Sequence, residues 1–141
     1  MAQQKNVVPV IEGLFEWPSK EPGLLASRCK KCGSLSFPKR PFCTNPDCET
    51  KRENIEEVKL GKKGTVYSFT YQIYQPPEPF KIDDFKPYAI GMVDFPEGLR
   101  IWGMFTRMEN LKLGMAVETT IGKLYEDDKN EYVTWMWKPI D

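Results

Sequence analysis

The sequence predicts a mainly β protein with a short N-terminal helical segment, a small cysteine-rich module and a C-terminal barrel. All four cysteines lie in two short loops between residues 29 and 48. From about residue 56 onward, apolar and polar residues alternate with the period of two that is typical of strands. The length of 141 residues suits one ordinary domain with a small attached module. We therefore expect domain boundaries at residues 1–27, 28–55 and 56–141.

Residues 1–27 are expected to begin with a short helix. Apolar side chains recur at helical spacing, at Val10, Leu14 and Trp17 and at Ile11 and Phe15. Pro18 and the Pro22-Gly23 pair interrupt this pattern, so an extended segment should follow the helix. The aromatic side chains of Phe15 and Trp17 favour packing against the body of the protein, but they also suit anchors for a protein partner.

The cysteines form the patterns Cys29-x2-Cys32 and Cys43-x4-Cys48. Two such loops can bring four thiolates together in a tetrahedron, which is the arrangement of a closed structural zinc site. Gly33 follows the first loop, where glycine permits the positive φ that such a tight turn needs. A module this small cannot bury its own core, so metal binding should supply much of its folding free energy. Because four sulfur ligands leave no open coordination position, we expect structural Zn²⁺.

The cellular compartment bears on the state of these cysteines. Glu12 and Glu16 interrupt any signal-peptide hydrophobic stretch, and no apolar run approaches the roughly 18 residues of a membrane span. We therefore expect a cytoplasmic protein, in which the cysteines stay reduced and bind metal. Disulfide bonds between the same cysteines are the alternative.

The chain contains no histidine. If all four sulfurs bind metal, it also contains no free cysteine. The chain then lacks both the cysteine thiol, a usual nucleophile, and the histidine imidazole, the usual base at neutral pH. The sequence therefore predicts no catalytic residue, and it favours a binding or scaffolding subunit over an enzyme that acts on its own.

The C-terminal part should contain five strands. They are expected at residues 64–74, 88–95, 99–106, 115–124 and 132–137, which are rich in β-branched and aromatic residues. Turns at 96–98 and 127–130 indicate hairpins, and the proline-rich residues 76–87 indicate a loop. Five strands without a long helix are typical of the small closed barrel called the OB-fold, with an open sandwich as the competing architecture.

Two aromatic stripes lie in these strands. Tyr67, Phe69 and Tyr71 alternate along the first strand, and Trp135 and Trp137 along the last. OB-folds can stack bases on exposed aromatic residues. Alternation is more often the signature of burial, so we predict that both stripes belong to the barrel core.

The net charge is zero, but it is unevenly distributed along the chain. Residues 28–63 hold ten Lys or Arg against five Asp or Glu, whereas residues 64–141 hold eight against twelve. A basic patch in the cysteine-rich module suits a phosphate-bearing ligand, either nucleic acid or a nucleotide-like cofactor. A solvated surface is the alternative interpretation.

The order of these parts resembles one protein family. The matching segments are residues 28–33, 37–43, 64–70, 87–90, 97–103 and 113–117, which occur in order over most of the chain from Arg28 onward. They include Arg28-Cys29-Lys30-Lys31-Cys32-Gly33 in the first cysteine loop and Gly64-Thr65-Val66-Tyr67 at the start of the barrel. The chain is thus similar to a family, long catalogued as a domain of unknown function, that joins an N-terminal helix, a rubredoxin-like zinc ribbon and a C-terminal OB-fold.

The resemblance implies an accessory role in acyl-CoA chemistry. Members of this family look like companions of thiolases, including small thiolase subunits of anaerobic toluene degradation. The implied function is a small subunit that binds a larger thiolase-type catalytic subunit and helps to hold or shield the coenzyme A thioester. Four basic residues would then contact the phosphates of coenzyme A, with ordinary solubilising charge as the alternative. These residues are Lys30, Lys31, Lys39 and Arg40.

The sequence departs from the family pattern in two places. The second cysteine loop of the family is often Cys-x2-Cys, whereas Cys43 and Cys48 are separated by four residues. This spacing still suits zinc, but it weakens the case for a rubredoxin-like iron centre. Residues 61–64, Gly-Lys-Lys-Gly, replace a tighter Gly-x-Gly and place an equivalent ligand contact at this turn in doubt.

Two other classes of function fit parts of the pattern. Zinc ribbons and OB-folds both occur in proteins that bind single-stranded nucleic acid, but such proteins usually show a broad basic face, which a neutral chain with an acidic barrel does not predict. A rubredoxin-like electron carrier would be a coloured iron protein. We therefore expect no nucleic-acid partner and no membrane partner.

Overall fold

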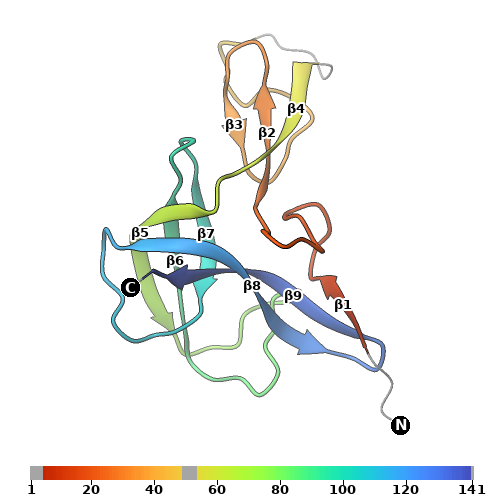
Figure 1. The fold of residues 1–141 in the computed structure, drawn as a ribbon, viewed down its shortest axis with the longest axis vertical. Helices are drawn as coiled ribbons and strands as arrows, with labels where there is room; N and C mark the ends of the chain where they lie inside the picture. The colour runs from red at the N-terminus through yellow and green to blue at the C-terminus, as the bar shows by residue number, and fades with distance from the viewer. Residues whose placement is uncertain (1–4, 49–53, 141) are drawn as a thin grey trace.

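The computed structural model describes residues 5–48 and 54–140. In this part of the chain, nine strands form one sheet of six strands and one of three. Figure 1 shows the smaller sheet standing above the larger one, with the N-terminal segment running from the side of the larger sheet up to the smaller. The smaller sheet carries the cysteines, and the larger sheet forms a barrel.

The barrel consists of five strands at the positions that the sequence predicts. They are β5 (Lys63–Gln72), β6 (Tyr88–Asp94), β7 (Arg100–Phe105), β8 (Ala116–Glu126) and β9 (Asn130–Pro139). The sheet runs in the order β9-β7-β6-β5-β8, and a further pairing of β8 with β9 closes it. This closure confirms the barrel and excludes the open sandwich.

The two predicted hairpin turns are also confirmed. Between β6 and β7, Gly98 adopts a φ of 103° and its N–H donates to the carbonyl of Phe95 at 2.9 Å. Between β8 and β9, the carboxylate of Asp127 accepts the N–H groups of Lys129 and Asn130 at 2.9 and 2.8 Å. A glycine with positive φ and an aspartate that caps its own turn are the usual solutions at such positions.

The expected N-terminal helix is wrong, because the described residues contain no α-helix. Residues Asn6–Pro9 instead form β1, which pairs in parallel with β9. The β-branched Val7 and Val8 favour a strand, and Pro9 disfavours a helix interior. The helical spacing of apolar residues further along reflects a folded-back segment, in which Phe15 pairs with Leu24 and Leu25 N–H donates to the carbonyl of Leu14 at 2.9 Å.

The smaller sheet contains β2 (Leu25–Cys29), β3 (Leu35–Ser36) and β4 (Ile55–Lys59), with β2 in the centre. The pairing of β2 with β4 runs from Leu25 opposite Lys59 to Cys29 opposite Ile55. One step beyond it, Leu60 N–H donates to the carbonyl of Leu24 at 2.8 Å, and both leucine side chains are buried. The small sheet is therefore joined to the barrel by a buried apolar pair.

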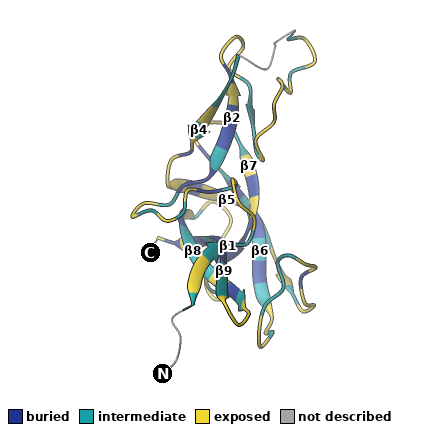
Figure 2. Ribbon diagram, turned by 90° about the vertical axis from the view of Figure 1, so that its right-hand side faces the viewer, coloured by how far each residue is buried: buried dark blue, intermediate teal, exposed yellow. Residues whose placement is uncertain are grey.

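The core of the barrel surrounds Trp137, which is 0% exposed. Its ring packs against Phe95 with 5.7 Å between ring centroids, and its Nε1 donates to the carbonyl of Gly91 at 3.3 Å. Gly91 and Gly103 face each other on β6 and β7, and a Cβ on Gly103 would lie 2.7 Å from the Trp137 ring. Figure 2 shows buried stretches along β2, β6 and β7. The prediction that Trp135 and Trp137 belong to the core is confirmed.

The prediction that Tyr67 and Tyr71 belong to the core is wrong, because each is 50% exposed. A β-bulge between Val66 and Ser68 shifts the alternation within the predicted stripe, so that Tyr67 lies outside under the guanidinium of Arg100 while Phe69 faces the core. Beyond Thr65, β5 has no pairing with β8, which leaves the later residues of β5 near solvent. Of the predicted stripe, only Phe69 packs against the core, on Phe105 at 6.3 Å.

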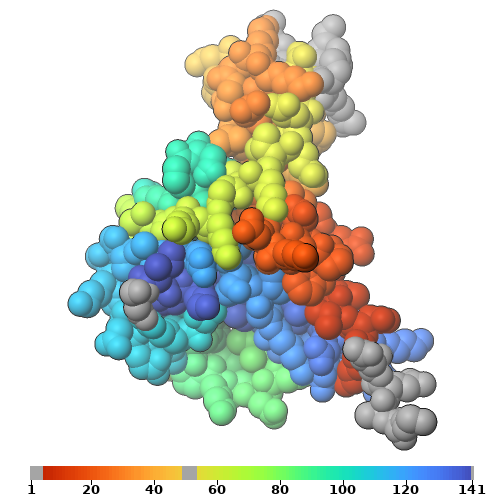
Figure 3. All heavy atoms as spheres, in the orientation of Figure 1, coloured from red at the N-terminus to blue at the C-terminus, as the bar shows by residue number. Residues whose placement is uncertain are grey.

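Trp135 connects the separate parts of the molecule. Its ring makes edge-to-face contacts with Phe15 of the N-terminal segment at 6.2 Å, Phe37 of the cysteine-rich module at 5.7 Å, and Phe80 of the loop before β6 at 6.0 Å. Figure 3 shows the N-terminal segment, in red and orange, packed along the side of the barrel below the small module. Aromatic contacts of this geometry contribute about 0.5–1.5 kcal/mol each beyond the area they bury.

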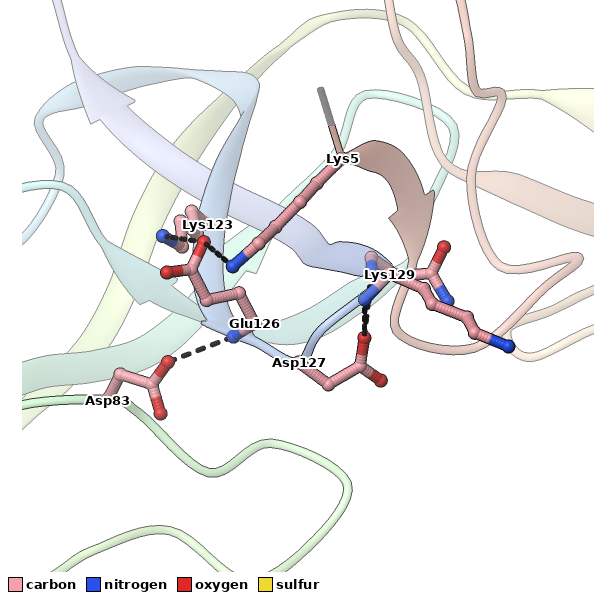
Figure 4. A network of polar contacts seen from close by, with 7 residues as sticks. Lys5, Asp83, Lys123, Glu126, Asp127 and Lys129 are labelled. Carbon is pink, nitrogen blue, oxygen red and sulfur yellow. Dashed lines mark hydrogen bonds and ion pairs between the residues drawn. The ribbon is translucent and has the colours of Figure 1, made fainter. Parts of the chain in front are cut away.

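Polar contacts at the end of the β8–β9 hairpin fix two further segments. Lys5, next to β1, forms an ion pair with Glu126 at 3.3 Å, and the backbone N–H of Glu126 donates to the carboxylate of Asp83 at 2.9 Å (Figure 4). Asp83 N–H in turn donates to the carbonyl of Leu124 at 3.0 Å. The loop between β5 and β6 is thus held against β8.

No helix in residues 5–48 or 54–140 has the length and the apolar character needed to cross a membrane.

We predict that Gly91→Ala lowers the free energy of unfolding by about 3 kcal/mol or more, because an added Cβ would lie 2.1 Å from the Ser68 carbonyl oxygen of the paired strand. Urea denaturation measures this change. Gly61→Ala is the matched control, since its Cβ would meet only the Glu97 carboxylate at 3.6 Å. It should stay within about 0.5 kcal/mol of the parent chain. Equal stability of the two variants would contradict the packing described here.

Candidate metal centre

The first cysteine loop begins at the end of β2. Cys29 is the last residue of that strand, and its carbonyl accepts the N–H of Gly33 at 2.8 Å. Cys29 N–H donates to the carbonyl of Ser34 at 2.9 Å, so the chain turns back on itself within a few residues. Gly33 adopts a φ of 82°, which confirms why a glycine follows the loop. This turn aims both sulfurs of the loop to one side.

The second cysteine loop is held by its own backbone and by Asn45. The N–H of Asn45 lies 3.4 Å from Sγ of Cys43, and its side-chain Oδ1 accepts the N–H of Asp47 at 3.0 Å. Its carbonyl accepts the N–H of Cys48 at 3.1 Å. The two extra residues of the spacing are thus absorbed in a compact turn that still brings Cys43 and Cys48 to the same point.

The four sulfur atoms converge. One ligand atom from each of Cys29, Cys32, Cys43 and Cys48 lies within 4.8 Å of all the others. The Cys32 and Cys43 sulfurs are 3.4 Å apart, and those of Cys29 and Cys48 are 3.9 Å apart. Tetrahedral Zn²⁺ with Zn–S bonds of about 2.3 Å requires sulfur separations of about 3.8 Å. None of these cysteines forms a disulfide bond.

The acidity of the thiols agrees with a site built for a cation. Hydrogen bonds from the hydroxyl and the N–H of Ser34, and a further one from Cys43, lower the pKa of Cys32 to about 6. The N–H of Asn45 acts in the same direction on Cys43, but desolvation and the neighbouring thiols raise the pKa of Cys43 to about 12. The cluster therefore resists several negative charges at once unless a cation neutralises them.

The donor set fits a structural Zn²⁺. Cys29, Cys32, Cys43 and Cys48 would hold it with four soft thiolates and leave no position for water or substrate. Bound there, the metal would join the end of β2 to the two loops. It would stabilise the module without taking part in a reaction.

The basic residues predicted to contact coenzyme A do not share one environment. The ammonium group of Lys39 forms an ion pair with Glu57 of β4. Lys30 lines a cleft of about 730 Å³ between the small sheet and the barrel, whereas Lys31 lines a separate hollow of about 400 Å³ beside Cys32. The backbone N–H of Arg40 donates to the hydroxyl of Ser27, and the Arg40 side chain is exposed.

The two aromatic residues considered as partner anchors are both packed against the protein. Phe15 is only 3% exposed and lies in the core, so it offers no surface to a partner. Trp17 is half-buried, packs against the core, and donates its Nε1 to the carbonyl of Val7 at 3.1 Å.

The sequence reasoning missed the residues that line the cleft with Lys30. They include Arg28, Lys59 and Glu97, which come from β2, β4 and the β6–β7 turn. Arg28 pairs with Glu56 across the sheet, and Lys59 pairs with Glu16 at 3.0 Å. No spacing in the sequence places these residues together, because the cleft exists only where two separately formed sheets meet.

A four-sulfur ribbon joined to a closed five-stranded barrel defines the class of zinc-ribbon and OB-fold proteins. The model of the rubredoxin-like zinc ribbon domain of ChsH2 matches residues 18–52, and that of the C-terminal OB-fold domain of ChsH2 matches residues 57–121. A DUF35 domain-containing scaffold protein of Methanocaldococcus jannaschii is 35% identical over 122 residues, which cover 84% of this chain and 82% of that protein. The chain therefore belongs to the family of DUF35 domain-containing proteins, which confirms the resemblance.

Other relatives are named as subunits of larger assemblies. Benzoylsuccinyl-CoA thiolase subunit BbsA of Geobacter metallireducens is 36% identical over 121 residues, covering 84% of this chain and 76% of that protein. The BbsA subunit of Thauera aromatica is 34% identical over 127 residues, covering 81% and 75%. Among solved structures, a chain of the Ltp2-ChsH2(DUF35) aldolase superposes with a TM-score of 0.61 at 24% identity, covering 83% of this chain and 84% of that chain. That likeness concerns the fold.

We predict that the purified chain carries about one zinc per molecule and that Cys32→Ser loses it on dialysis against a chelator, because a neutral hydroxyl replaces a thiolate. Elemental analysis measures the metal. Cys32 is exposed. If it were not a metal ligand, the Cys32→Ser variant would keep nearly the metal content and stability of the parent chain. Ser34→Ala is the matched control, since its hydroxyl lies 3.2 Å from Sγ of Cys32 but is not a ligand. A metal-free parent chain without titratable thiols would instead indicate disulfides.

Proposed function

We propose that this chain is a non-catalytic, zinc-binding accessory subunit of a thiolase-type acyl-CoA complex, in which it scaffolds a larger catalytic subunit. The relatives named as benzoylsuccinyl-CoA thiolase subunit BbsA carry this proposal, because they are 34% and 36% identical to the chain over most of its length. The relatives named as scaffold proteins support the same role. The complex as a whole would act as an acyl-CoA C-acyltransferase.

The chemistry of thiolases supports this division of labour. Such an enzyme needs a cysteine that takes the acyl group and a histidine or second cysteine that moves protons. This chain has no histidine, and its four cysteines lie together in one cluster. The reacting groups would therefore belong to the larger subunit.

The finer parts of the proposal concern coenzyme A. The subunit helps to hold or shield the thioester, and the complex acts in the degradation of an aromatic compound. Lys30 and Lys31 are exposed beside the metal cluster and suit the phosphates of coenzyme A, whereas Lys39 already has a carboxylate partner. Trp17 and the zinc ribbon would contribute to the contact with the larger subunit, in a protein of the cytoplasm.

We predict that the isolated chain has no thiolytic activity and that it co-purifies at a fixed ratio with a thiolase-type subunit encoded beside it. Thiolytic cleavage of an acyl-CoA by each subunit alone and by the co-expressed pair measures this, and full activity requires the pair. Turnover by this chain alone would contradict the proposal. Salt-sensitive binding to single-stranded oligonucleotides, without any enzyme partner, would instead favour a nucleic-acid-binding protein.

We predict that replacing both Lys30 and Lys31 by Gln raises the KM of the assembled complex for acyl-CoA several-fold while kcat changes little. Exposed lysines would attract the phosphates equally in the substrate and in the transition state, so their loss should change KM and not kcat. Added salt should reduce the difference in KM between the variant and the parent complex. Lys112→Gln is the control, because Lys112 is an exposed lysine on the barrel. An unchanged KM at low salt would place coenzyme A on the larger subunit only.

A further inference from the structure

An apolar pocket of about 380 Å³ opens in the wall of the barrel. It lies between β6, β7 and β9 and the loop that precedes β6. Its walls include Phe80, Tyr88, Ile90, Trp102, Met104 and Trp135. The sequence did not reveal it, because these residues come from four separate segments.

The pocket exists because β7 and β9 separate. Among the described residues, these two parallel strands pair only at Met104 opposite Met136 and Phe105 opposite Trp137. Before this pairing, the Nε1 of Trp135, one residue ahead of Met136, donates to the carbonyl of Trp102, two residues ahead of Met104, at 2.9 Å. The Trp135 side chain thus replaces the next backbone hydrogen bond between β7 and β9 and keeps the two strands apart. The opening between them is an indentation in the sheet rather than a flat apolar face.

The loop over the pocket is braced in place. The side-chain amide of Gln75 both donates to the carbonyl of Ile82 at 2.8 Å and accepts its N–H at 2.7 Å. Asp83 is bound to the end of β8 through the backbone of Leu124 and Glu126, as part of the contacts in Figure 4. Phe80, at the centre of this loop, packs on Trp135. The wall is therefore formed before any ligand arrives, which lowers the entropy cost of binding.

The lining selects an uncharged ligand. None of the residues that line the pocket is Lys, Arg, Asp, Glu or His. Aromatic edges and a methionine sulfur favour contact with rings, whereas a charge would lose its hydration without a partner. An enclosed cavity of about 150 Å³ suffices for benzene, so this larger, half-open pocket admits one substituted ring. Trp102 is 49% exposed at the rim, where a bound ring would cover it.

We propose that this pocket binds a single uncharged apolar ring of a small molecule, with any charged part of that molecule outside the barrel. The site is separate from the metal cluster and goes beyond the accessory role proposed above. It belongs to this chain alone, so it can be tested without a partner subunit.

The test uses the zinc-loaded full-length chain labelled with ¹³C at its methionine methyl groups and titrated with toluene. The Met104 methyl resonance should shift saturably, with a dissociation constant on the order of 1 mM for so small a ligand. The Met115 resonance, from a residue outside the pocket lining, should stay in place. The absence of a saturable shift of the Met104 resonance would overturn the proposal. So would a Met104 resonance that shifts when a protein partner is added but not when toluene is added.

Two variants test the location of the site. Trp102→Ala removes a half-exposed wall but keeps the backbone carbonyl that Trp135 binds, and it should weaken toluene binding roughly tenfold. Ile90→Phe fills the pocket and should abolish binding. Tyr74→Ala removes an aromatic side chain that is 74% exposed outside the pocket, and it should change the affinity less than about twofold. Zinc content and urea midpoints check that each variant is folded. Unchanged affinity in both pocket variants would overturn the proposal.

Discussion

The contacts of Trp135 determine how the parts of this molecule are arranged. The zinc ribbon, the N-terminal segment and the loop before β6 each place one phenylalanine against its ring, namely Phe37, Phe15 and Phe80. The indole N–H is also satisfied, by the carbonyl of Trp102. A ribbon of this size has no core of its own, so its apolar side chains must pack against the barrel. The position of Trp135 at the separation of β7 and β9 makes that contact possible and leaves an apolar pocket beside it.

Two separate features stabilise the ribbon at its opposite ends, namely the cysteine cluster and a buried pair of leucines. At the far end, a cation bound by the four sulfurs would neutralise thiolates that the cluster otherwise disfavours, since burial and the neighbouring thiols raise the pKa of Cys43 to about 12. At the near end, Leu24 and Leu60 extend the β2–β4 pairing into the buried region above the barrel. Metal loss would thus loosen the cysteine loops first, while the barrel keeps its own core around Trp137.

The five barrel strands and the convergence of the four cysteines could be predicted from the sequence, because alternation and cysteine spacing are local signals. The N-terminal segment could not, since its apolar residues have helical spacing but the segment is held by non-helical contacts, from Val10 to Val133 of β9 and from Phe15 to Leu24. The exposure of Tyr67 could not be predicted either, because a one-residue bulge shifts the alternation and the sequence pattern does not indicate the bulge. The pocket depends on where two strands separate, which only the closed barrel defines.

The four-cysteine cluster and the apolar pocket both have the chemistry of binding sites. A Zn²⁺ held by four sulfurs offers no position to a substrate. The pocket is lined by no Lys, Arg, Asp, Glu, His or Cys, and its side-chain hydroxyl groups are those of Tyr88 and Thr134. The metal would hold the cysteine loops to the end of β2, and the pocket would hold an apolar group. This chemistry agrees with the accessory role proposed above, in which the reacting groups belong to another polypeptide.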